Sequence, residues 1–94
     1  MSVMKKRKFT VTTEDGKTVQ VNRSPERLYL DGLPVAFITP DVSGTVHVFT
    51  GHTNWPIVML HRYVFSGATF WDILYDVPPT KDLAGQLQAL VKSV

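Results

Sequence analysis

The sequence predicts an α+β domain in which an antiparallel meander of about five strands is covered on one face by two or three C-terminal helices. Two Asp-Gly pairs, at residues 15–16 and 31–32, each separate apolar segments with the alternation typical of strands. Residues 45–50 alternate in the same way, and residues 70–94 carry apolar side chains at helical spacing. Short connections between the strands favour antiparallel neighbours.

The first hairpin is predicted over residues 9–22, with a three-residue loop. A two-residue loop would place Val11 and Val19 on opposite faces of the sheet. A loop of residues 14–16 instead pairs these valines, and it gives Gly16 the left-handed position of a type I turn followed by a bulge. Because a slip of one residue moves every side chain to the other face, burial favours the longer loop.

The second hairpin is predicted over residues 27–38, with residues 31–32 as a two-residue type I′ turn. This register places Leu30 opposite Leu33 and continues the same apolar face to Phe37. The fifth strand follows at residues 45–50. Its side chains alternate between the two faces, Val46 and Val48 on one and His47 and Phe49 on the other.

Residues 55–77 hold six of the ten aromatic side chains and are expected to supply most of the core. Within them, residues 56–65 fit two structures. Ile57, Leu60 and Val64 have helical spacing, whereas the many β-branched and aromatic residues favour a strand. We expect a helix.

Two more helices are predicted beyond that segment. Residues 69–77 form the first, with Thr69 and Asp72 resembling a capping box, and residues 80–94 form the second after two prolines. The expected buried stripes are Phe70, Ile73, Leu74 and Val77 in the first, and Leu83, Leu87, Leu90, Val91 and Val94 in the second.

Composition indicates one domain, residues 9–94, preceded by a flexible basic arm, residues 1–8. Without the four basic residues of the arm, six basic residues face eight acidic ones, and the net charge changes from +2 to −2. The chain has no cysteine, which fits a reducing compartment. It also has no apolar run of the roughly 18–20 residues that a membrane span needs. We expect a cytoplasmic protein that does not enter membranes.

The sequence offers little for catalysis. His47, His52 and His61 have spacings of five and nine, which match no familiar zinc pattern. No glycine-rich phosphate loop and no Gly-x-Ser-x-Gly elbow occurs. We expect no catalytic residue, metal or cofactor, although a small metal or acid–base site on the three histidines is an alternative.

Four aromatic residues suggest a binding surface instead. Trp and Tyr concentrate at binding hot spots because they bury a large area at a low entropic cost. Trp71 and Tyr75 lie off the apolar stripe of their predicted helix, and Trp55 and Tyr63 lie nearby in the sequence. These four residues predict a non-enzymatic protein-interaction module that binds a protein partner or, as a homo-oligomer, itself.

Nucleic-acid binding is the alternative function. Lys5, Lys6, Arg7 and Lys8 could contact phosphates, together with the C-terminal helices. Residues 56–77 also have the lengths of a helix–turn–helix, but the second helix carries Asp72 and Asp76 and no side chain suited to reading bases.

Overall fold

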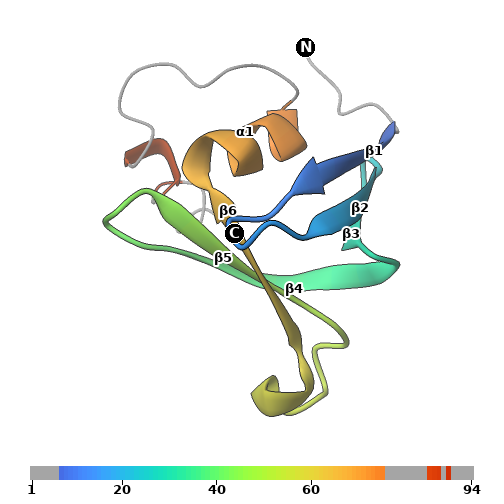
Figure 1. The fold of residues 1–94 in the computed structure, drawn as a ribbon. Helices are drawn as coiled ribbons and strands as arrows, with labels where there is room; N and C mark the ends of the chain where they lie inside the picture. The colour runs from blue at the N-terminus through green and yellow to red at the C-terminus, as the bar shows by residue number, and fades with distance from the viewer. Residues whose placement is uncertain (1–6, 76–84, 88, 90–94) are drawn as a thin grey trace.

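The computed structural model describes residues 7–75, 85–87 and 89, in which six strands form one antiparallel sheet in sequence order and the helix α1 lies over one side (Figure 1). The elements are β1 (Arg7–Thr12), β2 (Thr18–Arg23), β3 (Leu28–Leu30), β4 (Leu33–Pro40), β5 (Thr45–Thr50), the 3₁₀ turn η1 (Ile57–Met59), β6 (His61–Ser66) and α1 (Gly67–Tyr75). The predicted α+β class and antiparallel meander agree with this arrangement, although the strands number six.

The first hairpin has the predicted three-residue loop. Val11 pairs with Val19, as burial requires, and Gly16 has a φ of +86°. The loop is closed by the Thr13 N–H, which donates to the Lys17 carbonyl at 2.8 Å. β1 begins at Arg7, so Arg7 and Lys8 are part of the sheet.

The second hairpin has the predicted type I′ turn, but one side chain lies on the face opposite to the predicted one. Asp31 and Gly32 have φ values of +50° and +85°, and Leu30 pairs with Leu33. A bulge between Val35 and Phe37 then shifts the register of β4 against β5. Phe37 therefore lies on the outer face, where it stacks on Phe49 with ring centroids 4.7 Å apart. The prediction that Phe37 continues the inner apolar face is wrong.

The helix predicted over residues 56–65 is also wrong. Only residues 57–59 form a short 3₁₀ turn, and residues 61–66 form β6, which pairs with β5 at every position. Hydrogen bonding to the open edge of β5, together with β-branched and aromatic side chains, outweighs the helical spacing of three apolar residues. Because the first of its two helices does not form, residues 56–77 are not a helix–turn–helix.

α1 spans most of the predicted helix, but its cap differs. The Ser66 hydroxyl accepts the Thr69 N–H at 3.1 Å, so Ser66 occupies the capping position that was predicted for Thr69. Phe70 and Ile73 are buried, as predicted. Of the last helix, only Gly85–Leu87 and Ala89 are described, and they are helical; the predicted buried residues Val77, Leu83, Leu90, Val91 and Val94 lie outside the described residues.

The core lies between α1 and the inner face of the sheet. Among the described residues, most of it comes from β2, β3 and β5, so in this part of the chain residues 55–77 do not supply most of the core, contrary to expectation. The buried apolar residues in the described part are Val19, Val21, Leu30, Val46, Val48, Phe65, Phe70, Ile73 and Leu87. Among the described residues, no helix is long and apolar enough to cross a membrane.

Two long-range contacts complete the architecture. Arg23 is only 3% exposed, and its guanidinium donates to the carbonyls of Ile73 and Leu74 at 2.9 and 3.0 Å, which fixes the end of α1 to β2. The Glu14 N–H in the first hairpin loop donates to the Val64 carbonyl of β6 at 2.8 Å. The sheet is therefore curled so that its first hairpin meets its last strand.

Candidate interaction surface

The connection between β5 and β6 carries the most exposed apolar segment of the described structure. Ile57, Val58 and Met59 are 63%, 85% and 54% exposed. They form η1, which projects at the end of the molecule opposite α1 (Figure 1). The turn is closed by the Met59 N–H, which donates to the Pro56 carbonyl at 2.9 Å. These three residues are called the apolar tip below.

The base of the apolar tip is packed around Gly51. This glycine has a φ of +141°, and a Cβ there would lie 2.6 Å from Leu60 Cδ2 and 3.2 Å from Trp55 Cε3. The Trp55 ring also meets the His52 ring edge to face, with centroids 4.6 Å apart. Trp55 and His52 thus form an aromatic base beneath a short turn whose three apolar residues are each more than half exposed.

The four aromatic residues predicted to bind a partner do not form one surface. Trp55 lies before β6 and Tyr63 within it, whereas Trp71 and Tyr75 lie on α1, which begins directly after β6. β6 lies between Trp55 and α1, and a strand of six residues is about 20 Å long. Trp71 and Tyr75 contact each other, with ring centroids 4.6 Å apart, and Trp71 also packs against the core.

Tyr63 points to the inside of the curled sheet. Its hydroxyl donates to the Asp31 carboxylate at 3.2 Å, and the other oxygen of that carboxylate accepts the Gln20 N–H at 2.9 Å. Burial, and then the charge of Asp31 and this hydrogen bond, raise the pKa of Tyr63. Tyr63 therefore connects β6 to the turn between β3 and β4.

The three histidines do not lie together in one site. Among residues 7–75, 85–87 and 89, no three His, Cys, Asp or Glu side chains lie close enough to hold a metal ion. His52 contacts Trp55, and His61 is exposed at the start of β6. His47 lies 3.4 Å from the Asp41 carboxylate, at the turn between β4 and β5.

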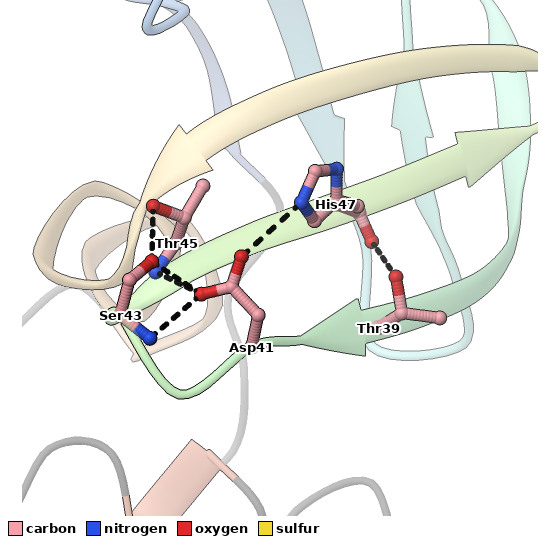
Figure 2. Close-up of polar contacts among 5 residues, drawn as sticks. All are labelled: Thr39, Asp41, Ser43, Thr45 and His47. Atoms are coloured by element: carbon pink, nitrogen blue, oxygen red, sulfur yellow. Dashed lines mark hydrogen bonds and ion pairs between the residues drawn. The ribbon is translucent and has the colours of Figure 1, made fainter.

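Figure 2 shows that this carboxylate organises the turn. Asp41 accepts hydrogen bonds from the Ser43 N–H at 2.9 Å and hydroxyl at 2.5 Å, and from the Thr45 N–H at 3.3 Å. These bonds, the Ser43 hydroxyl foremost, lower the pKa of Asp41. The carboxylate lies between the serine and the histidine, so the His47 imidazole contacts Asp41 rather than the hydroxyl, unlike the base of a Ser-His pair. The cluster is a turn-stabilising network.

The basic residues predicted to bind nucleic acid are only partly described. Lys5 and Lys6 lie outside the described residues. Arg7 and Lys8 are in β1, where the Arg7 guanidinium lies over the Phe9 ring, 4.0 Å from its centroid, and Lys8 is exposed. Binding of a nucleic acid by these four residues stays a prediction.

A cavity of about 770 Å³ lies beside the base of the apolar tip. It is lined by residues 34–38 of β4, Leu28 of β3, Leu74 of α1 and residues 51–54, and also by the exposed Glu26 and Arg27. Ala36 occupies the bulge of β4 within this wall. It is called the β4 cavity below.

Sequence reasoning missed the apolar tip because it assigned the apolar run 56–65 to a buried helix. One signal in the sequence could have found it: no Asp or Glu occurs between Asp41 and Asp72, so the whole β5–β6 region lacks carboxylates. Comparison with protein-family models, curated proteins and solved structures gave no match to this chain.

Proposed function

We propose that the chain is a non-enzymatic protein-interaction module that associates with a second copy of itself through the apolar tip. The exposure of Ile57, Val58 and Met59 carries this proposal. Of the four aromatic residues predicted from sequence, Trp55 belongs to this surface as the base of the tip. Tyr63, Trp71 and Tyr75 are not needed for it.

Burial of the apolar tip would stabilise a complex. A valine or isoleucine side chain contributes about 1.5–3 kcal/mol when it moves from water into an apolar environment. The proline ring fixes the φ of Pro56, and Leu60 and Trp55 pack at Gly51, so the base of the turn is restrained and the ordering cost of association is lowered. A projection of three adjacent apolar side chains on such a base is therefore suited to protein binding.

The charge distribution supports the same function. Interface centres are depleted of charged residues, because an ion that is desolvated without a partner costs several kcal/mol. No carboxylate lies between Asp41 and Asp72, and the nearest charged side chain after the tip is the exposed Arg62. Arginine is enriched at interfaces, where it commonly forms part of the contact.

Sedimentation velocity over a roughly hundredfold range of concentration tests the proposal. The wild-type chain should shift from monomer to dimer, and Val58→Asn should remain monomeric. Val42→Asn is the matched control, because Val42 is 96% exposed in the turn at the other end of β5. A wild-type chain that stays monomeric throughout, or equal weakening by the two substitutions, would overturn the proposal.

A further inference from the structure

We infer that the surface that receives the apolar tip is the β4 cavity of a second copy, and that two copies exchange tips about a two-fold axis. This inference rests on the proposed function, since it names the binding partner of the same tip. The tip and the cavity are the two halves of one interface. Each copy contributes both halves.

The β4 cavity suits an apolar occupant. Its volume, about 770 Å³, lies within the roughly 300–1,000 Å³ typical of ligand-binding pockets. Leu28, Val35, Ile38 and Leu74 line it with aliphatic surface, and Phe37 adds an exposed ring at its wall. Side chains such as those of Ile57, Val58 and Met59 match this lining in chemistry.

The tip and the cavity are adjacent on one molecule. Residues 51–54 form part of the cavity wall and lead directly to Trp55 and the tip. The Gly51 N–H donates to the Pro34 carbonyl at 2.9 Å, which joins this wall to β4. A two-fold interface needs both complementary parts on the same face, so that each copy gives and receives the same contact.

The area of the tip favours this arrangement over contact between two tips. One side of a standard interface buries roughly 800 Å². Three aromatic side chains, each burying about 150–250 Å², would supply at most about 750 Å², and the residues of the tip are smaller. Two tips in contact would therefore fall short, whereas reciprocal insertion buries both tips and the walls of both cavities.

A mixing experiment with two uncharged variants of the full chain separates these arrangements. Val58→Asn replaces the most exposed apolar side chain of the tip with a polar one, and Ala36→Gln places a polar side chain in the cavity wall. Each variant alone should lose both contacts of the dimer. Since each contact should weaken at least about tenfold, self-association should fall by roughly a hundredfold or more.

An equimolar mixture should recover part of the association. In the mixed dimer, the intact tip of the Ala36→Gln chain meets the intact cavity of the Val58→Asn chain, so one of the two contacts is restored. Phe37→Asn repeats the experiment at an exposed wall residue that stacks on Phe49 outside the core, in case Ala36→Gln does not fold. Circular dichroism establishes that each variant is folded.

Three outcomes would overturn the inference, and they are distinguishable. If Ala36→Gln and Phe37→Asn associate like the wild type while Val58→Asn does not, the tip binds another tip, and only the cavity is wrongly assigned. If the wild type stays monomeric, the proposed function fails too. If the monomer instead sediments with phosphatidylcholine or phosphatidylserine vesicles and Val58→Asn does not, the tip binds a lipid surface.

Discussion

Gly51 shows how a single residue determines the shape of the candidate surface. Its backbone conformation, with a φ of +141°, is one that residues with a side chain rarely adopt, and the space above its Cα is filled by Leu60 and Trp55. The chain reverses there between β5 and the tip. Both the backbone and the packing therefore require glycine.

We expect Gly51→Ala to destabilise the protein and to displace the base of the apolar tip. Residues held in sparsely populated backbone conformations cost about 1–3 kcal/mol, and the clash with Leu60 and Trp55 adds to this. Gly16→Ala is the matched control, because Gly16 has a φ of +86° but an added Cβ would meet nothing within 4 Å. Urea unfolding should show that Gly51→Ala lowers the free energy of unfolding more than Gly16→Ala does. Equal decreases would mean that the packing of Leu60 and Trp55 at Gly51 contributes nothing to stability.

At the scale of elements, the sequence predicts best what local chemistry determines. The registers of both hairpins follow from their Asp-Gly turns, and the bounds of β5 follow from alternation. β6 was missed because Ile57, Leu60 and Val64 fall at helical spacing by coincidence. The pairing of β6 with β5 depends on a long-range contact, which a local pattern does not contain.

The same limit applies to the candidate site. An apolar run such as residues 56–60 is normally assigned to the interior, so its exposure on a projecting turn could not be read from composition. The wall of the β4 cavity includes a bulge at Ala36, which the alternation of the sequence does not indicate. Trp55 was predicted to bind a partner, which stays a prediction, and its contacts with Gly51 and His52 could not be read from the sequence because they depend on the fold.

Arg23 joins two elements, and its replacement should loosen α1. Its hydrogen bonds to the Ile73 and Leu74 carbonyls also place a cation at the C-terminal end of the helix dipole. Each hydrogen bond to a charged group contributes about 1.5–3 kcal/mol, so Arg23→Met should lower the free energy of unfolding by at least about 2 kcal/mol. Hydrogen exchange should accelerate most in α1. Arg27→Met, at an exposed position, is the control and should change neither quantity.

At the scale of the whole molecule, the curled sheet brings together elements that are distant in sequence. The Glu14 N–H meets the Val64 carbonyl, and Tyr63 meets Asp31, so both the first hairpin and the β3–β4 turn are tied to the last strand. A chain with a small core depends on such contacts, because the net stability of a domain is only about 5–15 kcal/mol. The end of β6 that carries the apolar tip is thereby fixed to the rest of the sheet.

The Tyr63–Asp31 contact should make global stability depend on pH under alkaline conditions. Burial, and then the charge of Asp31, raise the pKa of Tyr63 above its ordinary value of 10.0, so the folded state holds the phenolic proton more tightly than the unfolded state. Its contribution is therefore complete below about pH 10 and decreases as the pH rises through the folded-state pKa. Absorbance titration should show a late-ionising tyrosine in the wild type that is lost in Tyr63→Phe. The free energy of unfolding should fall more steeply with alkaline pH in the wild type than in Tyr63→Phe. Equal pH dependence of the free energy of unfolding in the two proteins would mean that the Tyr63–Asp31 contact does not contribute to global stability.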